Sequence, residues 1–175
     1  MRVERATPED LLLVRAAYDR AQAIQRERHA PTWPDFSDDS ILNEIRAGRL
    51  FRIMDGDALS GVFTVAYEDA AIWGELERGA HIYLHRIART EHRAPSPLMQ
   101  TIVSWALAQC EAMARDGLRM DTWADNPAII AYYQSMGFEL IETRRMTNDP
   151  RLSPHYHGLE LALLERPLTP ARQSP

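Results

Sequence analysis

One stretch in the second half of the chain decides the fold: Met120-Asp121-Thr122-Trp123-Ala124-Asp125-Asn126-Pro127-Ala128-Ile129-Ile130-Ala131-Tyr132-Tyr133-Gln134-Ser135-Met136-Gly137-Phe138. Its apolar start predicts a strand that ends in a polar loop. Asn126 followed by Pro127 is a typical helix start, because asparagine caps free N–H groups and proline suits the first helical position. Gly137 is placed to end that helix in a left-handed conformation, and Phe138 opens another strand. The stretch therefore predicts a β–α–β connection.

The residues before this stretch add a second connection of the same kind. Residues 81–88 are typical of a strand, and residues 98–115 have apolar side chains at helical spacing, among them Leu98, Ile102, Cys110 and Met113. A strand over 118–123 follows. A strand, a long helix and a strand in succession predict a parallel pair of strands joined by a crossover.

The remaining elements predict the fold class. We expect a strand over 2–5, helices over 7–28 and 39–48, and strands over 50–54 and 58–67 that flank the turn Asp55-Gly56-Asp57. Thr7 and Asp10 form a capping box at the first helix. Loops are expected over 68–79 and 148–157, and the last strands over 138–143 and 158–164. This order predicts a mixed α/β (α+β) fold, with a central, mostly antiparallel, twisted sheet of about six to seven strands and helices on both faces.

Length and composition are those of one globular domain. The chain has 175 residues, 45% of them hydrophobic, and a formal net charge of −5. We expect a single domain over residues 1–166 and a disordered tail over 167–175, where prolines and small polar residues replace the apolar pattern. The single Cys110 excludes an intramolecular disulfide and a cysteine-based zinc cluster. Because the hydrophobicity of the sequence indicates neither a signal peptide nor a membrane-spanning segment, we expect a cytoplasmic protein.

These residues resemble the GCN5-related N-acetyltransferase (GNAT) superfamily. Asn126, Tyr133 and Gly137-Phe138, at spacings of seven and four, resemble the late motif of that family. Tyr83-Leu84-His85-Arg86-Ile87-Ala88, followed by a loop and a long helix, resembles its acetyl-CoA strand and pyrophosphate loop. The order of elements is similar to that of the family over about residues 2–165. The resemblance implies a GNAT-like fold that uses acetyl-CoA.

The resemblance also implies which residues bind the cofactor. The pantetheine arm would add to the backbone of Ile87 and Ala88 like an extra strand. The pyrophosphate would lie at the N-terminus of the helix that begins near Leu98, where N–H groups and the helix dipole favour anions. The family's loop is rich in glycine, whereas His92-Arg93-Ala94-Pro95-Ser96-Pro97-Leu98-Met99 contains none, and its two prolines remove N–H donors. Either Arg93 begins the loop motif or one residue is inserted. The expected cofactor-binding set is Ile87, Ala88, Arg93, Ser96, Leu98, Met99 and Asn126.

Two catalytic roles follow from the same resemblance. Tyr133 matches the tyrosine that often protonates the leaving thiolate, and a phenol with a reference pKa of about 10 stays protonated at neutral pH. His85 is the candidate base for the acceptor amine, because imidazole titrates near neutrality. Glu75 and Glu77 are alternative bases that would act through a water. Both residues could instead have a purely structural role, Tyr133 as an aromatic side chain of the core and His85 as a packed histidine of the strand. We expect the adjacent Tyr132 to have a packing role.

The sequence thus predicts an N-acetyltransferase that moves acetyl from acetyl-CoA to a primary amine of a small molecule or peptide by direct attack. The alternative is a weak or inactive GNAT-fold module that binds CoA or another small ligand. We expect no metal, because His155 and His157 lack an evident third ligand. We also expect no nucleic-acid or membrane partner and a possible homodimer. Aromatic side chains that could line the acceptor site are Trp33, Trp73 and Trp123.

Overall fold

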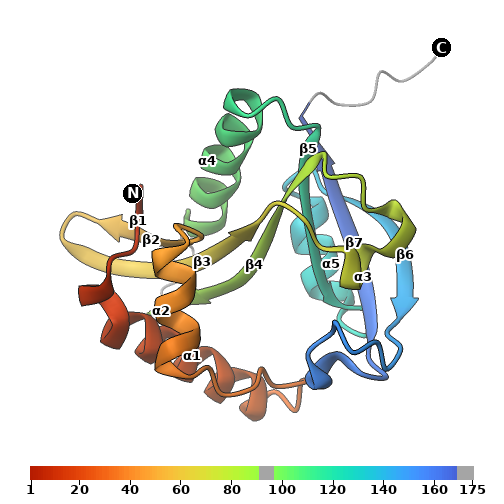
Figure 1. The fold of residues 1–175 in the computed structure, drawn as a ribbon, viewed down its shortest axis with the longest axis horizontal. Helices are drawn as coiled ribbons and strands as arrows, with labels where there is room; N and C mark the ends of the chain where they lie inside the picture. The colour runs from red at the N-terminus through yellow and green to blue at the C-terminus, as the bar shows by residue number, and fades with distance from the viewer. Residues whose placement is uncertain (91–96, 169–175) are drawn as a thin grey trace. The chain divides into compact units, whose positions relative to one another are not determined.

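The structure is a computed structural model that describes residues 1–90 and 97–168 (Figure 1). The chain divides into two compact units, which we treat separately. The first unit comprises Met1–Val65 and His85–Trp105, and the second comprises Ala66–Leu84 and the residues from Ala106 onward.

The secondary structure follows the predicted order. The strands form a seven-stranded sheet in the order β1-β2-β3-β4-β5-β7-β6. β4 and β5 are parallel, while β1–β2, β2–β3, β5–β7 and β6–β7 are antiparallel. The mixed, mostly antiparallel fold is therefore confirmed. The elements are β1 (Arg2–Arg5), α1 (Leu11–Glu27), α2 (Asp38–Arg46), β2 (Leu50–Asp55), β3 (Ala58–Ala66), α3 (Ala70–Trp73), β4 (His81–Arg89), α4 (Leu98–Ala112), β5 (Gly117–Trp123), α5 (Pro127–Gln134), β6 (Glu139–Arg145) and β7 (Glu160–Pro167).

Helices cover both faces of the sheet in the first unit. Leu50 of β2 and Val62 of β3 belong to a buried cluster with residues of α1 and α2. The next residues along these strands, Phe51 and Phe63, contact the ring of Trp105 of α4 at centroid distances of 4.4 and 5.4 Å. Successive side chains of a strand point to opposite faces. The α1–α2 pair and α4 therefore pack on opposite faces, as predicted.

Local capping fixes the helix starts that the sequence predicts. The Thr7 N–H donates to Asp10 Oδ2 at 2.8 Å, which completes the expected capping box. Asn126 Oδ1 accepts the Ile129 N–H at 3.1 Å at the start of α5. Gly137 has φ 84°, in the left-handed region expected after this helix. The β–α–β connection predicted from this stretch is confirmed.

Two segments differ from the prediction. The expected loop over 68–79 contains the short helix α3 and a 3₁₀ turn over Gly74–Leu76, and four residues are too few to show helical periodicity. The tail was expected to begin at 167, but Pro167 is the last residue of β7 and pairs with Gly117. The Leu168 N–H donates to the Asp116 carbonyl at 2.7 Å. Residues 169–175 lie outside the described residues.

Gly61 of β3 lies against the strand expected to bind the cofactor. A Cβ atom at this position would be 2.7 Å from the Ala88 carbonyl oxygen and 2.7 Å from Leu98 Cδ1. We predict that Gly61→Ala lowers the free energy of unfolding by about 1–3 kcal/mol, because backbone must move to relieve the overlap. Urea unfolding measures this, with the neighbouring Ser60→Ala as the control. Equal stability of the two variants would contradict the close approach.

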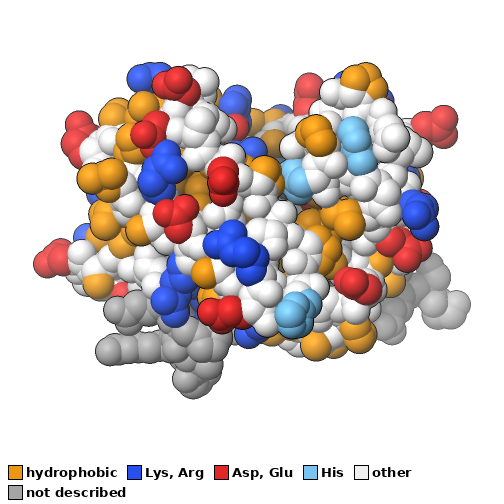
Figure 2. Space-filling model, turned by 90° about the horizontal axis from the view of Figure 1, so that it is seen from below, with side chains coloured by type: hydrophobic (Ala, Val, Ile, Leu, Met, Phe, Trp, Pro, Cys, Tyr) orange, Lys and Arg blue, Asp and Glu red, His pale blue; other side chains and the backbone are white. Residues whose placement is uncertain are grey.

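Three further features concern the surface, the length of the helices and the single thiol. The face drawn in Figure 2 carries arginine and acidic side chains interspersed with hydrophobic ones. None of the described helices has both the length and the apolar character needed to cross a membrane. Cys110 is fully buried, its Sγ donates to the Gly117 carbonyl at 3.3 Å, and burial raises the pKa of its thiol to about 11. Cys110 is therefore part of the packed interior.

Candidate active site

The expected cofactor strand is irregular at its centre. In β4, Arg86 lies between His85 and Ile87 and has φ 49°, a left-handed conformation that is uncommon for a non-glycine residue. Thr64 Oγ1 of β3 donates to the His85 carbonyl oxygen at 3.3 Å. Ala88 is buried, and Ile87 is half-buried. The left-handed residue interrupts the alternation of side chains and re-aims the backbone that precedes Ile87 and Ala88.

The first two side chains of α4 point into the protein interior. Leu98 and Met99, both expected to bind the cofactor, have side chains that are only 2% and 3% exposed. The Pro97 carbonyl accepts the Thr101 N–H at 2.8 Å. The helix therefore begins where the sequence predicts, and the burial of both side chains leaves the backbone as the part of Leu98 and Met99 that a cofactor could contact. Arg93 and Ser96, the other two expected loop residues, lie outside the described residues.

Tyr133, the expected acid, is half-buried on α5 in the second unit. Its ring contacts the rings of Tyr132 and Phe138 at centroid distances of 5.6 and 6.2 Å. Tyr132 is 40% exposed, which corrects our expectation that it packs in the core. Asn126, from the expected cofactor-binding set, uses its side-chain oxygen to cap the helix that carries Tyr133.

The alternative acidic bases differ in environment. Burial would raise the pKa of Glu77, but hydrogen bonds from Tyr83 and from the Asp69 and Gly79 N–H groups outweigh it and hold the pKa below its usual range. The Asp69 N–H lies 2.8 Å from Glu77 Oε2. A carboxylate with a lowered pKa is a weaker base, and Glu77 instead holds a turn. Glu75 is exposed in the 3₁₀ turn that follows α3.

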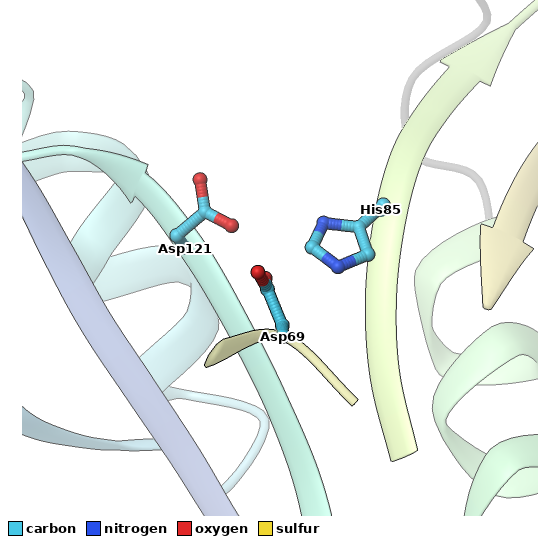
Figure 3. Close-up of side chains that lie close together, drawn as sticks. All are labelled: Asp69, His85 and Asp121. Atoms are coloured by element: carbon cyan, nitrogen blue, oxygen red, sulfur yellow. The ribbon is translucent and has the colours of Figure 1, made fainter. Parts of the chain in front are cut away.

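The structure brings together two acids that the sequence analysis did not single out. Carboxylate oxygens of Asp69, which precedes α3, and Asp121, on β5, lie within 4.8 Å of one another in the second unit. Figure 3 shows these two side chains, together with His85 on β4. Asp69 also accepts the Ile72 N–H at 3.4 Å. Two carboxylates this close attract cations and protons. The one signal in the sequence is a charged residue inside an apolar strand, at Asp121.

A second buried charge cluster supports this unit. Arg119 of β5 is 7% exposed. Its Nε lies 2.8 Å from Glu165 Oε2, and its Nη1 donates to the Leu76 carbonyl at 2.8 Å and to the Tyr83 hydroxyl at 3.1 Å. Its guanidinium carbon lies 4.3 Å from the Trp73 ring centroid. Trp73 is fully buried in this cluster, so it is a structural residue and not a lining of the acceptor site.

Glu165 contacts both Arg119 and His81 in this cluster. His81 Nε2 lies 3.5 Å from Glu165 Oε2. The hydrogen bond from His81 and the one from Arg119 outweigh burial and lower the pKa of Glu165 to about 2. Burial and Glu77 raise the pKa of Tyr83 well above its usual range. These side chains meet because β4, β5 and β7 are paired, with Tyr83 opposite Arg119 and Arg119 opposite Glu165.

The loop before β7 holds the two histidines considered as metal ligands. His155 Nδ1 lies 2.8 Å from Ser153 Oγ, and its ring lies 4.1 Å from that of Tyr156. Tyr156 in turn contacts Trp123 at 6.3 Å. Nε2 of His157 is buried and has no hydrogen-bond partner among the described residues. The two imidazoles thus have different surroundings.

Comparisons with known proteins agree with the fold. No family model matches the sequence. The chain is 27% identical over 105 residues to the "Uncharacterized N-acetyltransferase YesJ" of Bacillus subtilis, and this match covers 58% of the chain and 58% of that relative. A GNAT-family acetyltransferase from Listeria monocytogenes superposes with a TM-score of 0.70 at 19% identity, covering 94% of both chains. YncA of Salmonella typhimurium, solved with acetyl-CoA, superposes with a TM-score of 0.68 at 13% identity, covering 100% of this chain and 97% of that one.

The name of a further similar structure specifies the substrate of that protein. The ribosomal-protein-S18-alanine N-acetyltransferase of Escherichia coli superposes with a TM-score of 0.65 at 15% identity, covering 99% of this chain and 97% of that one. The chain has the fold of the GNAT superfamily, as the order of its elements predicts.

Proposed function

We propose that this protein is an N-acetyltransferase that transfers acetyl from acetyl-CoA to the primary amine of a small molecule or peptide. The amine nitrogen attacks the thioester carbonyl, the C–N bond forms and the C–S bond breaks. The nitrogen loses a proton to a base, and the CoA thiolate gains one from an acid. The proposal draws on the GNAT fold and on the similarity to a curated N-acetyltransferase.

The observation that carries the proposal is the left-handed Arg86 in the middle of β4. Irregular residues of this kind occur near active sites, where they re-aim backbone groups. The paired part of β4 and β5 runs from His81–Gly117 to Tyr83–Arg119, and β4 continues to Arg89. In our proposal the pantetheine arm adds to Ile87 and Ala88, and a backbone N–H of this segment polarises the thioester carbonyl.

We assign Tyr133 as the acid that protonates the thiolate and His85 as the base that accepts the amine proton. The Asp69–Asp121 pair is a second candidate base, because it would attract the ammonium form of the acceptor and take up its proton. The pyrophosphate lies on the first turn of α4, with Arg93 and Ser96 as expected loop contacts and Asn126 as a further cofactor contact. Acetyl-CoA serves as a co-substrate, and the mechanism uses no metal.

The proposal is tested by two measurements on the intact chain. Calorimetry with acetyl-CoA reports cofactor binding, and a thiol-reactive dye reports CoA release in the presence of a panel of amino acids, amines and short peptides. We expect saturable binding and amine-dependent thiol release, with the acetylated product found by mass spectrometry. Binding without release for every amine would favour the alternative, a GNAT-fold module that binds CoA without turnover. No binding at millimolar acetyl-CoA would contradict the proposal.

Pro97, immediately before α4, offers a test of the pyrophosphate site. Its ring removes an N–H at the point where a bound phosphate would accept one. We predict that Pro97→Ala lowers the Kd for acetyl-CoA about two- to tenfold, because one added hydrogen bond contributes about 0.5–1.5 kcal/mol. Calorimetry measures the change, and CoA lacking its 3′-phosphate serves as a comparison ligand. Unchanged binding of both ligands would place the pyrophosphate elsewhere.

The setting of the reaction is also part of the proposal. We infer a cytoplasmic enzyme, since acetyl-CoA is used there and the thiol is kept reduced in such a compartment. We propose that nucleic acid and membranes are not its partners and that the chain forms a homodimer. Sedimentation at micromolar concentration tests the dimer.

A further inference from the structure

One charged side chain of the first unit has no place in the chemistry described so far. The guanidinium carbon of Arg86 lies 4.6 Å from the centroid of the Phe36 ring, within cation–π distance. Arg15, Arg49 and Arg52 of the same unit each form an ion pair with a carboxylate. Among the described residues, no carboxylate forms an ion pair with Arg86. Within residues 1–90 and 97–168, its positive charge therefore has an aromatic ring but no carboxylate as a neighbour.

A buried phenol lies beside this charge. Tyr18 of α1 is 2% exposed, and its hydroxyl proton has no acceptor among the described residues. Burial raises the pKa of Tyr18 to about 12, while the charge of Arg86 and a hydrogen bond from its guanidinium to the phenol oxygen act to lower it. The phenol is therefore a proton donor at neutral pH. The negative charge of Glu44 also raises the pKa of Tyr18, but the Glu44 carboxylate forms an ion pair with Arg49 at 2.8 Å. A buried O–H group without an acceptor is destabilising, and a bound anion would supply that acceptor.

The aromatic side chains around these two groups are held in place. Tyr18 contacts Trp33 and Phe36 at ring centroid distances of 6.1 and 5.0 Å. Two glutamines of α1 fix the segment that carries them: Gln25 Oε1 accepts the Trp33 N–H at 2.9 Å, and Gln22 Nε2 donates to the Pro34 carbonyl at 2.8 Å. The side chains of Tyr18, Trp33, Phe36 and Arg86, which we call the α1–β4 cluster, are thus held in place by contacts within the chain.

The α1–β4 cluster is also joined to the proposed reaction strand. Arg86 follows His85 and precedes Ile87, and it holds the left-handed conformation that gives β4 its irregularity. Strained residues of this kind concentrate at binding and catalytic sites. A ligand held by Arg86 would therefore lie close to the backbone that we assign to the thioester.

We infer that Arg86 and Tyr18 bind a carboxylate of the acceptor, which makes the acceptor an amine that carries a carboxylate group, of the α-amino acid class. This inference rests on the proposed acetyltransferase function. A guanidinium binds a carboxylate through two parallel hydrogen bonds, and the Tyr18 hydroxyl donates a third. Trp33 and Phe36 offer an apolar wall for the rest of the acceptor. Arg86 is then a specificity-determining residue, distinct from the groups that move protons.

The test compares matched acceptors. The kcat/KM for each of the twenty common α-amino acids is measured beside that of its α-amide, which keeps the amine but removes the negative charge. We expect the best acid to exceed its amide at least tenfold, and Arg86→Gln to reduce this ratio about tenfold to a hundredfold, the range for hydrogen bonds to charged groups. Arg86→Lys should fall between, because lysine keeps the charge without the bidentate geometry. The exposed Arg46→Gln is the matched control and should keep the wild-type ratio.

Further readouts separate this inference from the proposed function. If acetyl-CoA neither binds nor turns over, the proposed function fails, and the α1–β4 cluster is then tested by binding alone. The same amino acids at millimolar concentration should raise the melting temperature of wild type but not of Arg86→Gln, and the amides should raise neither. The inference is overturned if acids and amides behave alike in both assays. It is equally overturned if Arg86→Gln lowers the melting temperature but keeps the acid preference, which would make Arg86 a packing residue only.

Discussion

Replacing Tyr133 by phenylalanine is expected to lower the turnover number about 10²–10⁴-fold, the range for the loss of a general acid. The change keeps the ring and its contacts with Tyr132 and Phe138, so folding should be unaffected. It removes only the proton that we assign to the leaving thiolate. Steady-state thiol release measures the effect, and calorimetry should show nearly unchanged acetyl-CoA binding.

Tyr132→Phe is the matched control for this experiment. It removes an identical hydroxyl from the adjacent residue, whose side chain is 40% exposed. The control should retain the wild-type turnover number. If Tyr133→Phe also has full activity on a verified acceptor, the role of Tyr133 as the acid is wrong. In that case the thiolate takes its proton from water or from another group.

Glu165→Gln is expected to lower the free energy of unfolding by about 3 kcal/mol, because it leaves the charge of Arg119 buried without its partner. Arg119 is 7% exposed, and Glu165 is its cross-strand neighbour at 2.8 Å. Glutamine keeps the shape of the side chain but not its charge. Urea unfolding at pH 7 measures the difference. Glu160→Gln, at an exposed position of the same strand, should change stability by less than about 0.5 kcal/mol.

The Glu165 carboxylate, held by His81 and Arg119, also predicts how stability depends on pH. The pKa of Glu165 lies near 2 in the folded protein, against an ordinary value of 4.5. A carboxylate whose pKa is lowered by folding stabilises the native state above its unfolded pKa, and this stabilisation is lost as pH falls through the folded pKa. The loss should therefore occur between pH 4.5 and about 2 and amount to about 2–3 kcal/mol. Across this window the free energy of unfolding should depend less steeply on pH for Glu165→Gln than for the wild type. Equal slopes for the two proteins would contradict the paired carboxylate.

The amino-acid sequence by itself determined the order of the main strands and helices of this protein and the caps of two helices. The Thr7–Asp10 box, the Asn126 cap and the left-handed Gly137 are all found where the sequence predicts them. Each depends on residues within one turn of the chain, and hydrogen bonds over so short a distance are set by residue type and local backbone geometry. The order of these elements then sufficed to predict the sheet and the helices on both of its faces.

Only the tertiary structure decided which polar side chains meet. Arg119 and Glu165 are far apart in the sequence and become neighbours through the pairing of β5 with β7. Asp69 and Asp121 meet in the second unit, and Arg86 meets Phe36 in the first. A charged residue inside an apolar strand, such as Arg119, signals in the sequence that a partner must exist, because an unpaired buried charge is too costly. Its identity depends on register, and register is fixed by the packing of the whole sheet, since a shift of one residue would turn every side chain to the opposite face.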